Sequence, residues 1–445
     1  MAEAVKQGIY KRRHPERTDY YRIIEGSHEE FKMSYPDLFE EKYGYMRAEV
    51  MKAIYSFLDC GIPENGMARV RCKECGYDFF VAFSCRCRGV CPSCSGKRSI
   101  LFGEKIREII VKPLTHIHIT FTIPKILRLY FRRNRKLLKL PAQSANYAVE
   151  KYFKESLKLS DGYTGGIYYI HSQGSLYNFH PHVHALVIAG IIKDGIFYEQ
   201  KNISTGVISE IFRARLLSVL LEEGAITQGL IDMLMTWNHN SGFNVHTKGR
   251  IDGDDGEAIE KIARYMSRPA ISVDRVEFNP DGNTVIVYEK QDRSPSRISE
   301  SYDIMEFMSL VAGHIPSPYE SLVYYYGIYS SSHRGKEKRE NSDNCCINVE
   351  KVGGIHRASS AWARLIRKIF EVDILRCKMC GGEMKIIAFI TGHESINKIL
   401  RHIREETIRP PPLKLKPIVE NNRETCPLDY IPPVDIYIRD PEYAN

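Results

Sequence analysis

The sequence predicts an α+β fold of two or three domains, on the basis of its length, its periodicity and its cysteine pairs. At 445 residues the chain exceeds the usual size of one hydrophobic core. Segments with helical and with strand periodicity follow one another in mixed order, without the regular alternation of a βαβ sheet. Closely spaced cysteine pairs predict in addition a small module built around a metal ion.

The amino-terminal region has spaced apolar side chains typical of helices, and Gly61 and Pro63 end this pattern. A cysteine-rich, zinc-ribbon-like module is expected next, followed by a sheet domain with helices. A polar linker or exposed loop is expected at 330–344 and a helix at 361–370. The tail has eight prolines in 36 residues and is expected to run extended over the surface. The predicted boundaries are 1–70, 71–98, 99–310, 311–409 and 410–445.

Three segments of the sheet domain show strand signals. In the first, apolar and polar side chains alternate, which predicts a half-buried strand that Pro124 ends. The other two flank a turn at Gly174 and are expected to pair antiparallel. The expected strands are 115–122, 167–171 and 180–189, and the expected helices are 125–157, 208–221 and 258–266.

Most of the twelve cysteines lie in short C-x-x-C pairs, and no signal peptide precedes them, which favours metal-binding thiolates over disulfides. Two pairs separated by fifteen residues predict one structural zinc ion bound by four thiolates. The expected ligands are Cys72, Cys75, Cys91 and Cys94. Cys85 and Cys87 lie between the pairs, so a different choice of four stays open.

A third pair, Cys377 and Cys380, has no second pair close to it in the sequence. It is either half of another metal site or a turn with two thiols that bind nothing. The candidates to complete a site around it are Cys345, Cys346, His393 and Cys426.

The amino terminus from Met1 to Arg17 is polar and basic, and no later apolar run is long enough to cross a bilayer. Secretion and membrane insertion are therefore not expected, and the expected location is the cytoplasm.

The net charge of +8 is concentrated in residues 97–139, where twelve Lys or Arg residues stand against two Glu residues. Such a segment on an otherwise near-neutral chain predicts a phosphate-binding surface, with a solvated basic face as the alternative. Tyr130 and Phe131 could stack on bases there or pack in the core. The expected DNA contacts are Lys97, Arg98, Arg132, Arg133, Arg135 and Lys136.

The strand at 180–189 carries the sharpest catalytic hypothesis. Residues two apart in a strand share a face, so His182 and His184 project together and can hold one divalent ion. His116 and His118 form a second pair of this kind on another expected strand. The third ligand is open among His118, His180 and His246.

The helix at 258–266 begins after the acidic residues Asp254 and Asp255, and Pro269 ends it. Tyr265 stands at the edge of the apolar stripe of this helix, with Lys261 one turn earlier on the same side. A phenol placed opposite the histidine strand could attack a phosphate, although most of the 27 tyrosines must simply pack.

Taken in order, these motifs make the chain resemble rolling-circle insertion-sequence transposases of the IS91 type, in the HUH nuclease superfamily. The resemblance covers nearly the whole chain. Its segments here include Arg88-Gly89-Val90-Cys91-Pro92-Ser93-Cys94, His182-Val183-His184, Ala263-Arg264-Tyr265, Arg268-Pro269, His314-Ile315-Pro316, Tyr325-Tyr326-Gly327 and Arg376-Cys377.

The resemblance implies an antiparallel sheet domain of ferredoxin or RRM type that carries the HUH pair. It implies that His182 and His184 bind Mg²⁺ or Mn²⁺, and that Tyr265 becomes joined to the 5′ phosphate of cleaved DNA. A phenol, with a pKa of about 10, is a weak nucleophile near neutral pH, so an ion that polarises the phosphate fits this role. The implied partners are single-stranded or hairpin ends of an insertion element.

Relatives of this class often carry two catalytic tyrosines four residues apart, whereas position 261 here is lysine. The second strand transfer would then reuse Tyr265 or need another subunit, which makes a homodimer one of the arrangements to consider. Lys261 could instead steady the scissile phosphate.

Two other functions compete with this one. A non-catalytic zinc-ribbon DNA-binding regulator would use the histidine strand and Tyr265 only for packing. A metal-dependent hydrolase with a His-x-His motif would need further histidines and an aspartate at barrel strand ends, and the βα alternation of a barrel is missing.

Overall fold

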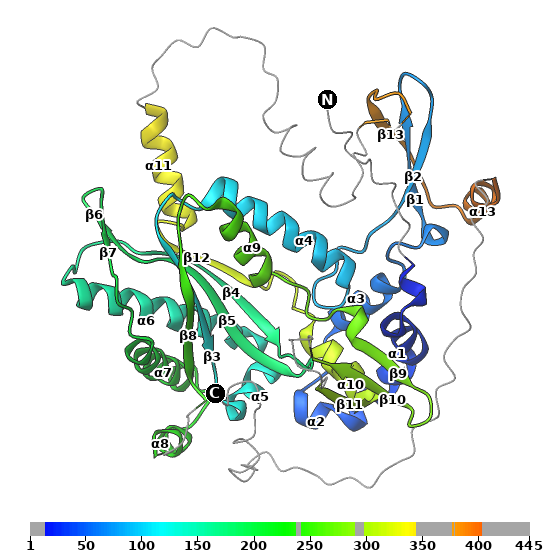
Figure 1. Cartoon of the computed structure of the whole chain (residues 1–445). Coiled ribbons are helices and arrows are strands. Elements are labelled where there is room, and N and C mark those ends of the chain that lie inside the picture. The colour runs from blue at the N-terminus through cyan, green and yellow to red at the C-terminus, as the bar shows by residue number, and fades with distance from the viewer. Residues whose placement is uncertain (1–13, 237–241, 290–297, 344–375, 378, 403–445) are drawn as a thin grey trace.

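The computed structural model describes residues 14–236, 242–289, 298–343, 376–377 and 379–402. These residues form helices and antiparallel sheets (Figure 1), which confirms the predicted α+β class. Among them no helix has both the length and the apolar character needed to span a membrane. The helix expected at 361–370 and the proline-rich tail lie outside the described residues.

The central sheet has five antiparallel strands in the order β12-β4-β5-β3-β8. All three expected strands are present, and β4 and β5 pair antiparallel as expected. The outer strands β8 and β12 were not predicted. The bounds are β3 His116–Thr122, β4 Gly165–Gln173, β5 Phe179–Ile188, β8 Asn244–Ile251 and β12 Val323–Gly327.

The two faces of this sheet have different coverings, with α6 and α7 on one side and α4 and α9 on the other (Figure 1). Phe121, Val183 and Ala185 are buried on the α6 and α7 side. Because side chains alternate along β5, His182 and His184 lie on the α4 and α9 side. The bounds are α4 Pro92–Lys105, α6 Lys139–Leu157, α7 Thr205–Glu222 and α9 Gly256–Met266.

A second core joins the amino-terminal helices to a segment that follows the tyrosine helix. Tyr20, Ile54 and Phe307 are members of this core. The amino-terminal region is therefore helical as expected. The segment that contains α10 packs against it. Its elements are α1 Asp19–Leu38, α2 Glu40–Tyr43, α3 Ala48–Leu58 and α10 Ile304–His314, with the sheet β9 Val276–Asn279, β10 Thr284–Tyr288 and β11 Ser299–Asp303.

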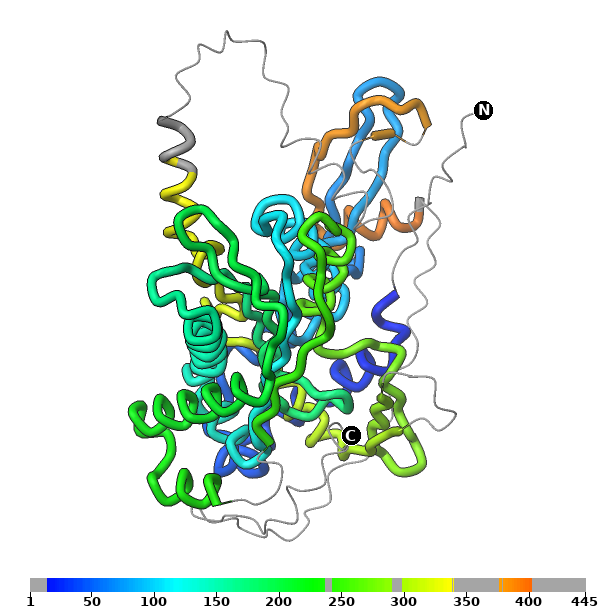
Figure 2. Tube along the Cα trace, turned by 60° about the vertical axis from the view of Figure 1, so that its left-hand side comes forward, coloured from blue at the N-terminus to red at the C-terminus, as the bar shows by residue number. Residues whose placement is uncertain are grey.

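A small three-stranded sheet joins an early hairpin to a strand near the end of the described residues. Strand β13 (Met384–Ile390) pairs with β1 (Met67–Cys72), and β1 pairs with β2 (Asp78–Ala82). Figure 2 shows this late segment, in orange, alongside the early hairpin in blue, with α13 (His393–His402) after it. The predicted domain boundaries stay a prediction, but these strands cross from one expected domain to another.

The expected linker at 330–344 is wrong, because α11 (Ser331–Asp343) is a helix. Ser330 accepts a hydrogen bond from the backbone of His333 at 3.2 Å, and Lys112 forms an ion pair with Glu337 at 2.6 Å. A polar segment of good helix formers needs only such a cap and anchor to become helical. The remaining elements are α5 Lys125–Arg133, α8 Gln228–Thr236, β6 Gly190–Lys193 and β7 Ile196–Glu199.

Candidate active site and metal centres

Three histidines cluster on the face of the central sheet that α9 covers. His182 and His184 project from β5, and His171 of β4 lies directly opposite His182 in the ladder. One ring nitrogen of each histidine lies within 4.8 Å of the others, and all three side chains are buried. The sequence predicted the pair but missed His171. The turn between β4 and β5 sets the register of the two strands. Counting back from this turn would have placed His171 opposite His182.

One hydrogen bond of His182 fixes which of its two ring nitrogens carries the lone pair. Its Nδ1–H donates to the backbone carbonyl of His180 at 2.8 Å, so Nε2 carries a lone pair. This Nε2 is 3.2 Å from Nε2 of His184. If an ion lay about 2.1 Å from both nitrogens, the nitrogen–ion–nitrogen angle would be about 100°. This angle suits an ion with five or six ligands.

His171 has the same arrangement. Its Nε2–H donates to the backbone carbonyl of Met266, the last residue of α9. Its Nδ1 is buried and has no hydrogen-bond partner among the described residues. An orphaned buried nitrogen beside two other imidazoles fits a third metal ligand.

None of the three sequence candidates for the third ligand belongs to this group of three. His118 contacts His184, with its Nε2 at 3.2 Å from Nδ1 of His184. The same Nδ1 lies 3.1 Å from the Thr120 hydroxyl. His180 contributes its carbonyl to His182, and His246 is exposed on β8. His118 therefore orients a ligand and does not stand in the group of three.

Burial keeps these imidazoles neutral, which is the form that binds metal ions. It lowers the pKa of His118 to about 4. It also lowers the pKa of His171 and of His184 well below the ordinary value, with neighbouring histidines adding to the effect.

Helix α9 brings Tyr265 to this cluster. Asp255 caps the helix, because its carboxylate accepts from the Ala258 backbone at 2.9 Å, and the helix begins at Gly256, two residues before the expected bounds. Ala263 and Met266 are buried against the sheet, so Tyr265 lies at the edge of the helix. Its ring centroid is 5.3 Å from that of His184.

Two cations lie over the ring of Tyr265. The Lys248 ammonium on β8 is 5.6 Å from the ring centroid, and the Arg268 guanidinium is 4.8 Å from it. Lys261, which the sequence selected, is exposed one turn earlier on α9. The sequence missed Lys248 because it predicted no strand there.

Helix α4 holds the carboxyl end of α9. The Ser99 hydroxyl donates to the backbone carbonyl of Arg264 at 2.7 Å, and the Ser267 hydroxyl donates to Ser99 at 3.1 Å. The helices meet at Gly103, where an added Cβ would lie 2.5 Å from Cγ of Arg264. Tyr265 is therefore fixed between two contacts with α4.

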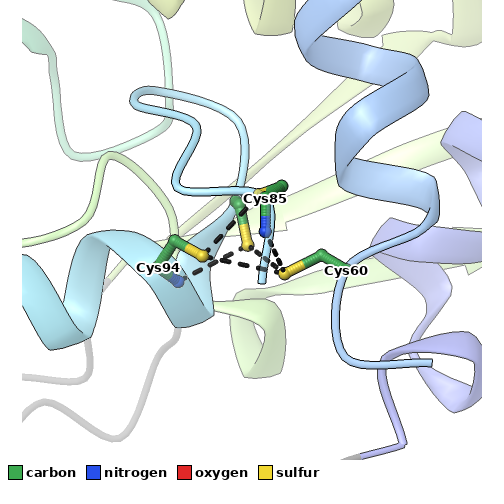
Figure 3. A group of neighbouring side chains, drawn as sticks. Cys60, Cys85 and Cys94 are labelled. Atoms are coloured by element: carbon green, nitrogen blue, oxygen red, sulfur yellow. Dashed lines mark hydrogen bonds between the residues drawn. The ribbon is translucent and has the colours of Figure 1, made fainter. Parts of the chain in front are cut away.

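A buried cluster of four thiols lies at the start of α4 (Figure 3). Its members are Cys60, Cys85, Cys91 and Cys94. The sulfur atoms of Cys60 and Cys94, of Cys60 and Cys91, and of Cys85 and Cys94 are each 3.7 Å apart. Four sulfurs about 2.3 Å from a tetrahedral zinc ion would be about 3.8 Å apart, so this set fits zinc.

The predicted zinc site is wrong in its grouping, because the four expected cysteines belong to two clusters. Cys72 and Cys75 lie with Cys377 and Cys380. The hairpin of β1 and β2 carries the first pair to its tip, about 20 Å from its base. The chain then returns before it reaches Cys85. Cys60, at the end of α3, was missed altogether.

Two family models match the chain. One, described as a putative transposase, matches residues 165–337, and the other, a transposase zinc-binding domain, matches residues 30–123. Together they cover more than half of the sequence. The chain belongs to the IS91-type transposases. The histidine cluster and Tyr265 fall within the first match, and the Cys60 cluster falls within the second.

A curated relative supports the same family. The transposase for insertion sequence element IS801 of Pseudomonas savastanoi pv. phaseolicola is 24% identical over 374 residues, which are 78% of this chain and 86% of the relative. No solved structure matches the chain significantly.

A transposase must bind DNA, but two of its expected DNA contacts have their guanidinium groups bound within the fold. The Arg132 guanidinium lies 3.3 Å from the centre of the Tyr43 ring and donates to the Ser309 carbonyl at 2.8 Å. Arg135 is paired with Glu320, and the two side chains are 6% and 11% exposed. The prediction of DNA contacts for these two arginines is therefore wrong.

Of the other expected contacts, Arg98, Arg133 and Lys136 are exposed. For the neighbouring aromatic residues, the alternative to base stacking was packing in the core. This alternative is confirmed for Phe131, which is fully buried in the core of the transposase.

The transposase has a cavity of about 820 Å³ between the amino-terminal region, the Cys60 cluster and the segment that follows α9. Lys97 and Arg268 line it together with Gln173 and the aromatic ring of Phe83. Arg268 lines this cavity, and its guanidinium also lies over the ring of Tyr265.

Proposed function

We propose that this transposase nicks and rejoins single-stranded DNA at the ends of its insertion element, through a covalent bond between Tyr265 and a 5′ phosphate. His171, His182 and His184 would hold the divalent ion that assists the reaction. The observation that carries this proposal is the convergence of one phenol and three buried imidazoles on one face of the central sheet.

A divalent ion bound at these histidines would polarise the scissile phosphate and stabilise the charge that develops on it. The phenol of Tyr265 loses its proton as its oxygen attacks phosphorus. The bond from phosphorus to the 3′ oxygen breaks, and this oxygen takes up a proton and leaves as a 3′ hydroxyl. Lys248 and Arg268, which lie over the tyrosine ring, would attract the phosphate to this position.

The rejoining step is the reverse reaction with a different strand. A 3′ hydroxyl attacks the phosphotyrosine, a phosphodiester forms, and Tyr265 regains its proton. The covalent bond keeps the energy of the original phosphodiester, so no nucleotide is consumed.

The donor set favours Mn²⁺ over Mg²⁺, the other ion expected from the sequence. Three imidazoles are borderline donors that suit transition metals, whereas Mg²⁺ prefers oxygen ligands. We therefore expect Mn²⁺ to support the reaction at lower concentration than Mg²⁺.

The cavity that Arg268 lines would take nucleotides on one side of the scissile phosphate. Lys97 and Arg268 offer positive charge to the backbone, and the Phe83 ring offers a surface for a base. An unpaired strand fits this arrangement, because the phenol must reach a backbone that is not held in a duplex.

The decisive experiment follows a covalent adduct. A single-stranded oligonucleotide with an element end and a 3′ label is incubated with the transposase and Mn²⁺, and the label is expected to move to the protein on a denaturing gel. Tyr265→Phe should abolish the adduct, and Tyr198→Phe, on the exposed strand β7, should leave it unchanged. An adduct that survives in Tyr265→Phe would contradict the proposal. The absence of any adduct would favour the non-catalytic regulator.

The second strand transfer can be assigned in the same assay. With lysine at position 261, it needs either the release of Tyr265 or the tyrosine of a second copy. Rejoined product from single turnovers at protein concentrations too low for dimers supports reuse of Tyr265. A rate that depends on the square of the protein concentration supports a homodimer.

A further inference from the structure

We propose that the transposase binds a second zinc ion at Cys72, Cys75, Cys377 and Cys380, separate from the ion at the Cys60 cluster. The two later cysteines lie outside both regions that the family models match. The proposal does not depend on the role of Tyr265.

The four sulfurs are close enough to share one ion. One ligand atom of each residue lies within 4.8 Å of the others. The sulfurs of Cys72 and Cys380 are 3.5 Å apart, and those of Cys75 and Cys377 are 3.4 Å apart. These distances are a few tenths of an ångström below the edge expected for zinc, and far above the about 2.05 Å of a disulfide.

The two pairs have the loop structure that zinc thiolates use. Each has the sequence Cys-Lys-x-Cys-Gly, and both glycines, Gly76 and Gly381, have positive φ angles of 72° and 77°. In the later loop the backbone N–H groups of Met379 and Gly382 lie 3.4 Å from the sulfurs of Cys377 and Cys380. Amides directed at sulfur stabilise thiolate charge, which a pair of incidental thiols would not require.

The small sheet around these cysteines has too little core to explain its own stability. One of its two small buried clusters contains Val70 and Met384 besides two of the cysteines, and the other contains Met67, Ile396 and Leu400. A core of this size rarely folds without a metal ion or a disulfide. Zinc binding would supply the missing free energy and would fasten β13 to β1, which lies about 300 residues earlier in the chain.

The experiment counts zinc in the full chain. His182→Ala with His184→Ala serves as the background, so that the histidine cluster takes up no zinc, and two zinc ions per chain are expected by elemental analysis. Cys377→Ser with Cys380→Ser should lower the count to one. Cys87→Ser is the matched control, because Cys87 is the described cysteine that belongs to neither cluster, and it should leave two.

Two further measurements keep the outcome clear. Cobalt replacement should give the visible spectrum of two tetrathiolate sites, and the double serine variant should lose half of its intensity. Circular dichroism checks that the variant keeps its helices. An unchanged zinc count in the double variant, or disulfides between these cysteines in the freshly purified protein, would overturn the proposal.

Discussion

Replacing Gly103 with alanine tests whether α4 sets the position of Tyr265. The new Cβ would lie 2.5 Å from Cγ of Arg264 and 3.2 Å from Cγ of Glu260. Carbon atoms normally stay about 3.5 Å apart or more, so α9 or the Arg264 side chain must move by about 1 Å. Arg264 directly precedes Tyr265, and a shift of about 1 Å at a reacting group can cost about 100-fold in rate.

The effect on stability should be much smaller than the effect on rate. Overpacking costs about 1–3 kcal/mol, and replacing glycine by alanine inside a helix returns about 1 kcal/mol. We therefore expect the free energy of unfolding in urea to fall by about 0–2 kcal/mol, while the single-turnover rate of adduct formation falls about 100-fold.

Gly96 provides the matched control on the same helix. A Cβ added there meets no atom within 4 Å, so Gly96→Ala should raise stability by about 1 kcal/mol and leave the rate unchanged. A Gly103→Ala protein that forms the adduct at the wild-type rate would refute the idea that α4 positions the tyrosine.

Three other predictions follow from the structure. His171→Ala should weaken Mn²⁺ binding, measured by calorimetry, by more than the about 10–100-fold typical for a supporting group, and unchanged affinity would exclude His171 as a ligand. Arg135→Ala leaves Glu320 buried without its partner and should cost about 3–5 kcal/mol in urea unfolding, against less than about 0.5 kcal/mol for the exposed Lys136→Ala; equal costs would contradict this. Burial lowers the pKa of His314 to about 3, so the unfolded chain binds the proton first and stability falls as the pH drops below about 6.5. Between pH 7 and pH 5 the loss from this group is about 2 kcal/mol, and His314→Gln should lack it.

The sequence was sufficient to predict the inner strands of the sheet and the two histidines on β5. Buried strands with one polar face alternate clearly, so the pattern alone assigns each side chain to a face. Edge strands lack this signal. Strand β8 is largely exposed and carries polar residues in sequence, so neither the strand nor Lys248 could be found.

The cysteine pairing could not be predicted from spacing. Nearby C-x-x-C pairs were grouped because they are close in sequence, but the cost of closing a loop grows only slowly with its length. Cys377 can therefore join Cys75 across about 300 residues at little extra entropic cost, provided that β13 pairs with β1. That pairing depends on a strand far along the chain, which local periodicity does not connect to the hairpin.

A count of charges also could not distinguish basic side chains that bind within the fold from those that are free to bind DNA at the surface. Arg132 and Arg135 lie in the most basic segment, yet their guanidinium groups join α5 and the turn after it to the amino-terminal helices and to α10. A guanidinium offers five donors and a flat face, so it can fill such a junction as well as it can bind a phosphate.

Helix α4 connects the Cys60 cluster to the end of α9 that carries Tyr265. Cys91 caps its first turn and accepts from the Cys94 backbone, and both belong to the Cys60 cluster. Two turns later Ser99 and Gly103 hold the end of α9 that carries Tyr265. A rigid helix transmits a displacement at its start to these contacts, because the thiolates fix where the helix begins. The structural zinc ion would then act on DNA cleavage through geometry alone, without contact with substrate.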